Sequence, residues 1–406
     1  MNKKFLFYGL IVLLMSAQYL SVCSANAENP ENIKVENTTT KASDELVEKG
    51  YALYKNGKLD EALNCFDEAL ALDKSNMGAY QAKVMIHIGR NNFDAAIAEC
   101  NKAIADNPND TAPYFIHGYT MIVYFNNTGN EDFIDSAVED YAKCFSLSEN
   151  PAETCFSRSL ACSMVSFSLD DEYSKNAITL REKAENYIIQ SLKLDNNNAE
   201  AHCFYGYIKI MDQTTKTTQK TYKFAIDEFN KSLAIKPTAS AYNCRGVVYA
   251  KKFKKFDSAI EDFTNEIKIL RNDIEILNKS ESNKKKDLST AKKDLSEAYI
   301  GRAFCYLQKK NYRLALRDYN SALKENPENH KAYNNRGIIY AKQGEWEKAL
   351  SDFKTALELN SEYKTAKDNL NLSQKKASQN KFSFDESIYL QFRFERTQPN
   401  NKKAGT

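Results

Sequence analysis

The side chains best suited to nucleophilic, redox or metal chemistry in this sequence are its nine cysteines and four histidines. No two cysteines form a C-x-x-C motif, and no histidine lies three or four residues from a cysteine or another histidine, as helical metal ligands do. We therefore expect no metal ligands, and we expect the histidines to lie in or beside the core. Leaving aside Cys23, we expect the cysteines to be free structural thiols: Cys65, Cys100, Cys144, Cys155, Cys162, Cys203, Cys244 and Cys305.

The motifs of the common catalytic and cofactor sites are absent from the sequence. It contains no phosphate-binding G-x-x-x-x-G-K-[ST] loop, no G-x-S-x-G nucleophile turn and no H-E-x-x-H zinc motif. Acidic residues are numerous, but their spacing places them on solvated helix faces rather than in a pair suited to acid–base catalysis. We therefore predict no catalytic residues, no cofactor and no enzymatic activity.

The composition favours a helical protein without a nucleic-acid-binding surface. The 56 Lys and Arg nearly balance the 54 Asp and Glu, so no basic footprint for nucleic acid is expected. Only 13 Gly and 7 Pro occur among 406 residues, which favours many helices joined by short turns. Hydrophobic residues make up 42% of the chain, enough for an extensive core.

The N-terminus has the pattern of an export signal. A short basic start precedes an apolar run, and Ala25-Asn26-Ala27 ends the segment with an Ala-x-Ala cleavage pattern. We predict a signal peptide over residues 1–27 and a flexible leader over 28–42, so the protein is expected to be secreted or periplasmic. A lipid anchor on Cys23 is the alternative, because the residues before it resemble a bacterial lipobox; only then would the protein contact a membrane.

A repeat with a period of 34 residues organises the chain. Residues 296–329 and 330–363 align without a gap. In the second copy, Tyr333, Gly337 and Tyr340 are spaced i, i+4, i+7 and therefore share one helix face. A turn follows, and a second stripe of Ala349, Phe353 and Ala356 has the same spacing. Small residues in both stripes allow two helix axes to approach to about 8–10 Å, so each copy predicts a helical hairpin.

This pattern resembles the tetratricopeptide repeat family. The resemblance implies an all-α, right-handed superhelical solenoid of about eight helix-turn-helix repeats with a C-terminal capping helix. The array is expected over residues 43–376, with a capping helix from Lys364 to about Lys376. We number the expected repeats 1 to 8 in chain order: 43–76, 77–110, 111–150, 151–198, 199–238, 239–272, 296–329 and 330–363.

Two segments of the chain do not follow the repeat. Residues 267–295 are too long for a turn, and apolar residues at helical spacing predict an inserted antiparallel helical hairpin; a charged, partly disordered linker is the alternative. In the tail, residues 377–406, apolar and polar residues alternate from Phe382 to Phe394. We expect a disordered tail; because the alternation is typical of a strand, a strand docked on the array or on a partner is the alternative.

A stripe beside the core positions of each first helix is the candidate binding surface. In the family that this chain resembles, repeat positions 2, 5, 9 and 12 line a concave groove that binds peptides; we call these positions the first-helix stripe. The residues expected to line the groove are Tyr51, Tyr54, Met85, Phe115, Tyr119, Tyr207, Asn243, Phe304 and Asn334. The alternative is that many of these side chains pack against neighbouring repeats.

We therefore predict an exported scaffold or adaptor that binds a protein or peptide partner through this groove. An accessory subunit of a cell-envelope assembly or secretion complex is the alternative, with the inserted hairpin or the tail as its contact. A transient peptide ligand would indicate the first function, and a stoichiometric membrane complex would indicate the second.

Overall fold

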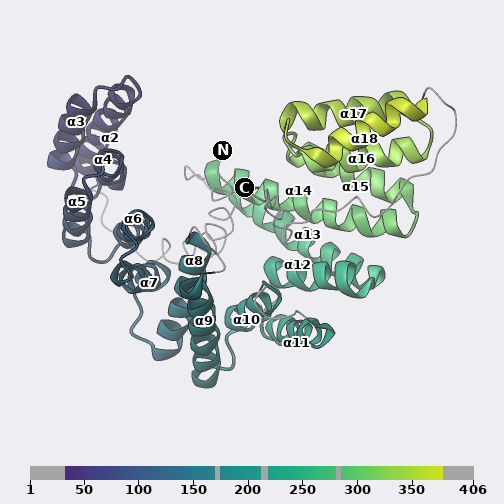
Figure 1. Ribbon diagram of the computed structural model, residues 1–406, viewed down its shortest axis with the longest axis horizontal. Helices are drawn as coiled ribbons and strands as arrows, with labels where there is room; N and C mark the ends of the chain where they lie inside the picture. Colours follow the sequence, from purple (N-terminus) through teal and green to yellow (C-terminus); the bar gives the residue numbers. More distant parts are fainter. Residues whose placement is uncertain (1–32, 170–173, 212–217, 280–284, 378–406) are drawn as a thin grey trace, which may run out of the picture. The chain divides into compact units, whose positions relative to one another are not determined.

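The computed structural model describes residues 33–169, 174–211, 218–279 and 285–377. These residues form α-helices joined by short turns, with no strand among them. The chain divides into two compact units, Met1–Ala201 and His202–Thr406. The all-α, paired-helix architecture expected from the repeat is confirmed (Figure 1). Among the described residues, no helix is both long enough and apolar enough to cross a membrane.

The first unit consists of antiparallel helix pairs, in which each odd-numbered helix packs on the helix before it. Its helices are α2 (Ile33–Lys55), α3 (Leu59–Leu72), α4 (Met77–Gly89), α5 (Phe93–Asp106), α6 (Ala112–Thr128), α7 (Asp132–Phe145), α8 (Pro151–Ser168) and α9 (Lys175–Leu194).

The second unit continues the same scheme from α10, which spans the boundary between the units. Its helices are α10 (Ala199–Met211), α11 (Gln219–Ile235), α12 (Ala239–Val248) with the π-helical turn η1 (Tyr249–Phe253), α13 (Phe256–Lys279), α14 (Lys285–Gln308), α15 (Tyr312–Glu325), α16 (His330–Lys342), α17 (Trp346–Leu359) and α18 (Lys364–Ala377).

Small residues set the distance between the two helices of a pair. Ala349 and Ala356 on α17 are fully buried, and Gly337 on α16 faces Phe353. A Cβ atom added at Gly337 would lie 2.9 Å from the Phe353 ring, closer than carbon atoms pack. The glycine is therefore required at this helix contact, as the sequence pattern predicts.

Asparagine caps define where many helices begin. Asn76, Asn92, Asn311 and Asn329 each accept a hydrogen bond from the backbone N–H three residues on, at 3.1–3.3 Å. An N-terminal backbone N–H has no partner inside its own helix, so each cap satisfies one donor and favours one start point.

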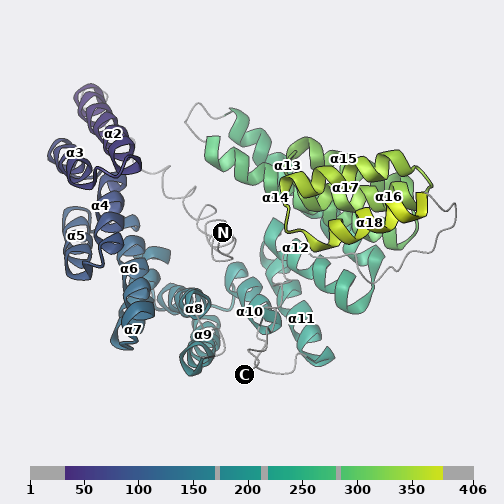
Figure 2. The ribbon, with the colours of Figure 1, turned by 45° about the horizontal axis from the view of Figure 1, so that its top comes forward.

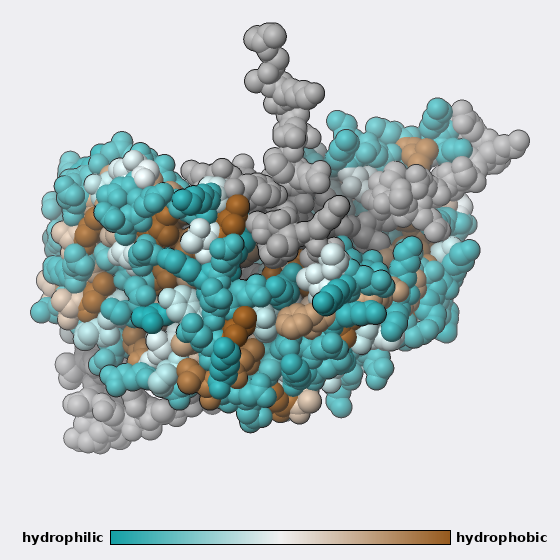
Figure 3. Space-filling view, turned by 60° about the horizontal axis from the view of Figure 1, so that its bottom comes forward, coloured by the Kyte–Doolittle hydropathy of each residue, from teal (hydrophilic) through white to brown (hydrophobic). Residues whose placement is uncertain are grey.

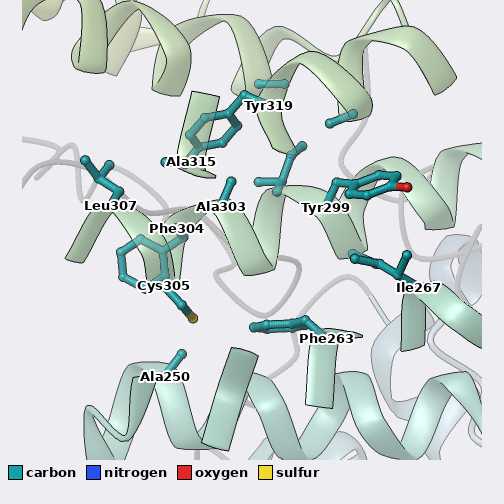
Figure 4. Close-up of a cluster of buried hydrophobic side chains, with 14 of the residues drawn as sticks. Ala250, Phe263, Ile267, Tyr299, Ala303, Phe304, Cys305, Leu307, Ala315 and Tyr319 are labelled. Atoms are coloured by element: carbon teal, nitrogen blue, oxygen red, sulfur yellow. The ribbon is translucent and has the colours of Figure 1, made fainter. Parts of the chain in front are cut away.

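A core of the second unit joins α13, α14 and α15. Phe263, Tyr299 and Tyr319 are at most 3% exposed and converge between these helices (Figure 4). Small side chains such as Ala303 and Ala315 fill the space between the rings. Successive hairpins therefore share one continuous core, which is how a repeat array buries the apolar face of each hairpin.

Two helices extend beyond the repeat length. α13 and α14 pack against each other, and their ends at Lys279 and Lys285 project past α15–α18 (Figures 1 and 2). Within residues 267–295, where the sequence analysis predicted a helical hairpin and kept a charged linker as the alternative, the described residues are therefore helical. Residues 280–284 lie outside the described part of the chain.

The other differences from the predicted boundaries lie near the ends. Helix α2 begins at Ile33, so residues 33–42 are helical rather than part of a flexible leader. The helix is continuous because this segment contains neither Gly nor Pro to end it. At the other end, α18 packs on α17 and α16 in the place of the predicted capping helix. The signal peptide and the tail lie outside the described residues, apart from Ala377.

Candidate protein-binding surface

The first-helix stripe is open to solvent in repeats 1 and 2. Tyr51 and Tyr54 on α2 are 38% and 42% exposed, and Met85 on α4 is 40% exposed. Large apolar side chains with this much exposure are few among the described residues, and three of them share one stripe on neighbouring helices. On the face shown in Figure 3, hydrophobic side chains are scattered among hydrophilic ones. An exposed apolar group of this kind is typical of a protein-binding surface.

Tyr51 connects this open stripe to the core beneath it. Its ring meets the fully buried Phe66 edge to face, with 5.5 Å between ring centroids. Its hydroxyl donates a 3.4 Å hydrogen bond to the Gly78 carbonyl at the start of α4. Partial burial raises the pKa of Tyr51 above its ordinary value, so the hydroxyl stays protonated at neutral pH. The α2 side of the stripe is thus held in place before any ligand binds.

The stripe becomes less exposed in repeats 3 and 5. Phe115 and Tyr119 on α6 are half-buried, and the Phe115 ring lies 5.8 Å from the Tyr141 ring. Tyr207 on α10 is also half-buried and packs against the cluster around Phe229. These three aromatic residues contribute to the core and keep part of their surface exposed.

In repeats 7 and 8 the prediction of stripe residues is wrong. Phe304 is 5% exposed and packs into the core of α13–α15, with Phe256 edge to face at 6.1 Å. Asn334 is fully buried: its Nδ2 donates to Asn335, and its Oδ1 accepts from Asn369 of the capping helix at 2.9 Å. Phe304 is covered by α13 and α15 and Asn334 by the capping helix α18, so neither can line a groove.

Asn243 is committed to a contact inside repeat 6. Its Nδ2 donates to both carboxylate oxygens of Glu266, at 2.9 and 3.1 Å. Glu266 is 4% exposed and stands where the repeat pattern requires a small residue. Asn243 therefore compensates for the irregular Glu266, because a buried carboxylate needs hydrogen-bond donors.

Paired basic and acidic residues between the two helices of a hairpin are a feature that the sequence analysis missed. Arg302 holds Asp318 with two hydrogen bonds, at 2.7 and 3.0 Å, and Arg336 holds Asp352 in the same way, at 2.9 and 2.7 Å. Asp318 is 1% exposed. The period of 34 superimposes these residues on each other, so the signal was present in the alignment.

The same basic residues also reach the preceding hairpin. The Nη1 atom of Arg336 donates to Asn320 at 2.7 Å, and that of Arg302 donates to Thr264 at 3.1 Å. In repeat 2, Lys83 similarly contacts Glu99 of its own hairpin and Asp67 of repeat 1. These contacts hold each repeat to the one before it, which is a structural role.

Repeat 6 keeps its pair although it has one additional residue. Arg245 and Asp262 are 17 residues apart, whereas the pairs of repeats 7 and 8 are 16 apart, and two hydrogen bonds of 3.0 and 2.6 Å still join them. The π-helical turn η1 accommodates the insertion between them. The insertion therefore changes the helix geometry and leaves the pairing intact.

The four histidines lie at packing positions. His117 approaches Asp140 at 2.7 Å, and His202, which is 2% exposed, approaches Glu228 at 2.6 Å. Burial is the main cause that lowers the pKa values of His87 and His330. His117 and His202 thus contribute to the contacts between the two helices of their hairpins.

The cysteines that the structure describes are free thiols, and most of them are buried. Burial raises the pKa values of Cys100, Cys144 and Cys162 to about 12, so these thiols stay protonated and unreactive at neutral pH. Cys155 and Cys203 are partly exposed. Within the described part of the chain, this distribution agrees with the structural role expected for the thiols.

Comparisons with known proteins support the repeat assignment. The family model described as "Tetratricopeptide repeat" matches residues 53–115, 296–329 and 330–363. A curated relative is the Hsp70-Hsp90 organising protein of Plasmodium falciparum (isolate 3D7), which is 31% identical over 104 residues. That match covers 25% of this chain and 18% of the relative, so the chain matches only a small part of that protein.

Solved structures with similar helix pairs include two whose sequences differ widely from this one. A chain of the APC/C hetero-tetramer Cut9–Hcn1 is 14% identical, with a TM-score of 0.45; the match covers 85% of this chain and 59% of that one. YrrB, described as a TPR protein with an unusual peptide-binding site, is 19% identical, with a TM-score of 0.39 and coverage of 59% and 99%. On these family-model matches, residues 53–115, 296–329 and 330–363 are tetratricopeptide repeats, and the chain is a repeat protein built from paired helices.

Proposed function

We propose that this protein is an exported adaptor that binds an extended or helical segment of a partner along the first-helix stripe of repeats 1 and 2. The observation that carries the proposal is the exposure of Tyr51, Tyr54 and Met85, which are each about two-fifths exposed on adjacent first helices. The half-buried Phe115 and Tyr119 extend this surface into repeat 3. The corresponding positions Phe304 and Asn334 are buried, which favours ligand binding in the first unit.

The chemistry of this stripe favours apolar contact with the ligand. Tyrosine can remain in water and still bury its ring against a partner, and methionine adapts its shape to irregular surfaces. Binding energy at interfaces is usually concentrated in a few such residues. Since none of the three side chains carries a charge at neutral pH, the affinity should depend little on salt.

A double substitution on two helices tests the stripe. Tyr54→Ala with Met85→Ala removes exposed side chains from α2 and α4, and the control Leu72→Ala with Leu194→Ala removes side chains that are 47% and 60% exposed elsewhere in the first unit. Crosslinking and mass spectrometry in the native organism would identify partners of the unmodified protein. We expect the stripe variant to bind such a partner more than about tenfold less tightly, a loss of ~1.4 kcal/mol.

The control variant should bind that partner normally, and circular dichroism should show that both variants keep their helix content. Unfolding of the stripe variant would show that these side chains belong to the core and would contradict the proposal. Normal binding by a folded stripe variant would also contradict it. In that case, loss of binding on deletion of 377–406 would place the contact in the tail.

The export part of the proposal rests on the basic start, the apolar run and the Ala25-Asn26-Ala27 pattern. If the signal is cleaved there, intact-mass measurement of the protein from its native source should show a mature N-terminus at Glu28. Retention of Met1 would contradict export by cleavage. A mass that includes an acylated Cys23 would indicate a lipid anchor instead.

A further inference from the structure

The net charge of the chain is near zero because its two units carry opposite net charges that nearly cancel. Residues 1–201 contain 17 Lys and Arg against 29 Asp and Glu, a net charge of −12. Residues 202–406 contain 39 against 25, a net charge of +14. Each unit therefore carries a field that the whole-chain balance of +2 does not indicate.

One group of cations in the second unit lies in the turns between the first and second helices of repeats 6 and 7. Successive first helices run in the same direction, so these turns follow one side of the unit (Figure 1). The exposed side chains of Lys309 and Asp257 form an ion pair that joins the two turns. We call the exposed cations of both turns the basic edge: Lys252, Lys254, Lys255, Lys309, Lys310 and Arg313.

Two of these lysines occupy a backbone conformation that normally favours glycine. The turn residues Gly57, Gly129 and Gly344 have φ angles of 73–78°, and Asn91 has 56°. At the corresponding point in repeats 6 and 7, Lys254 and Lys310 have φ angles of 53° and 58°. A long side chain is disfavoured there relative to glycine. The turns therefore carry lysine at a position where glycine would be less strained.

The surroundings of the basic edge argue against nucleic acid and against a membrane. Lys252 lies 5.0 Å from the Tyr222 ring centroid and Lys255 lies 5.9 Å from that of Tyr249, so ammonium groups already cover faces on which bases would stack. The basic edge has a single arginine, although arginine is the usual partner of phosphate. None of the exposed large hydrophobic residues lies in these two turns to enter a lipid surface.

The lysines of these turns already form ion pairs with carboxylates of the same chain. Asp257 contacts Lys309 in the basic edge, and Glu345 contacts Lys348 at 2.5 Å in the next turn. We propose that the basic edge is a second interaction surface, which binds an acidic segment of a partner protein. This surface lies in the second unit and does not depend on the apolar stripe of the first.

Removal of the two strained lysines gives a test in which the fold should be preserved. In the full chain, Lys254→Gly with Lys310→Gly removes two charges and suits the backbone better. The matched control, Lys236→Gln with Lys324→Gln, removes two exposed charges at the ends of the second helices α11 and α15. The probe is a fluorescein-labelled twelve-residue peptide of alternating Glu and Gly, and its binding is measured by fluorescence anisotropy.

The glycine variant should bind the peptide at least about threefold less tightly, because two exposed ion pairs are lost. Its melting temperature should not fall, and the control should bind as the unmodified protein does. Binding should weaken at higher salt, because the contacts are exposed and ionic. If the glycine variant loses helix content, Lys255→Gln with Arg313→Gln keeps the native turn backbone and should show the same loss of binding.

Three results would overturn the proposal. The first is equal weakening in the control, which would show a diffuse charge effect. The second is unchanged peptide binding by a folded variant. The third is tighter binding of a twelve-residue oligothymidylate, or of phosphatidylserine vesicles, than of the peptide, which would assign the basic edge to nucleic acid or to a membrane. If Tyr54→Ala with Met85→Ala does not weaken partner binding, the proposed function fails, but the interpretation of the acidic-peptide experiment does not change.

Discussion

The two units use the same helical hairpin but expose different parts of it. In the first unit, Tyr51, Tyr54 and Met85 remain exposed on the first-helix stripe. In the second unit the stripe residues Phe304 and Asn334 are buried, and exposed charges gather in the turns instead. This difference in exposure shows that a repeat position specifies only the direction in which a side chain points from its own helix. The neighbouring helices then decide whether that side chain is covered.

The two longest helices that the structure describes lie in the second unit and pack against each other. α13 and α14 each contain 24 residues, whereas α4 and α5 of the first unit contain 13 and 14. Between the longer helices lies a core in which Phe263, Tyr299 and Phe304 are all at most 5% exposed. Phe304 is covered by this core and by Phe256 at the start of α13.

The comparison predicts its largest effect at two stripe residues, Phe304 in repeat 7 and Tyr54 in repeat 1. Phe304→Ala should lower the free energy of unfolding by about 4 kcal/mol, because it removes a fully packed ring and leaves a cavity. Tyr54→Ala on the open stripe should cost less than about 1 kcal/mol. Urea unfolding followed by circular dichroism measures both. Similar losses for the two variants would show that the stripe of repeat 1 is as buried as that of repeat 7.

A second prediction concerns the paired charges of the second unit. Asp318→Ala should cost about 3 kcal/mol, because it leaves the Arg302 guanidinium largely buried without its carboxylate. Glu275→Ala removes an exposed partner of Lys279 and should change stability by less than about 0.5 kcal/mol. The same urea titration separates the two. A small effect at Asp318 would indicate that water replaces the carboxylate.

The third prediction tests whether Asn243 supports the fold or remains available to a ligand. Asn243→Leu should cost about 2 kcal/mol, because Glu266 would lose both donated hydrogen bonds while buried. Combining it with Glu266→Ala, which restores the small residue of the repeat pattern, should recover much of the loss. If the single variant is as stable as the unmodified protein, Glu266 has other partners sufficient to hold it.

The smallest effect expected is a difference in thiol reactivity within each unit. Cys155 and Cys203 are partly exposed and should react first with a thiol reagent at pH 8. The raised pKa values of Cys100, Cys144 and Cys162 keep their thiolate fractions negligible at that pH, so these residues should react only after unfolding. Mass spectrometry of the labelled peptides gives the order. Early labelling of Cys144 would reveal local opening of repeat 3.

The sequence by itself determined the helical hairpin and its repetition. The spacing of Tyr333, Gly337 and Ala349 depends on helix geometry and on contact between adjacent segments, so it can be read from one period of the chain. It also indicated the apolar stripe of Tyr51, Tyr54 and Met85, whose exposure the structure agrees with.

Only the tertiary structure decided which stripe positions remain open and which charges are paired. Phe304 and Asn334 have the same repeat spacing as exposed residues, but α13, α15 and α18 cover them. Glu266 stands where the repeat pattern requires a small residue, and the structure shows that Asn243 donates a 2.9 Å hydrogen bond to it. The physical reason is that burial depends on the summed contacts of helices distant in sequence, whereas periodicity records the direction of a side chain from its own helix.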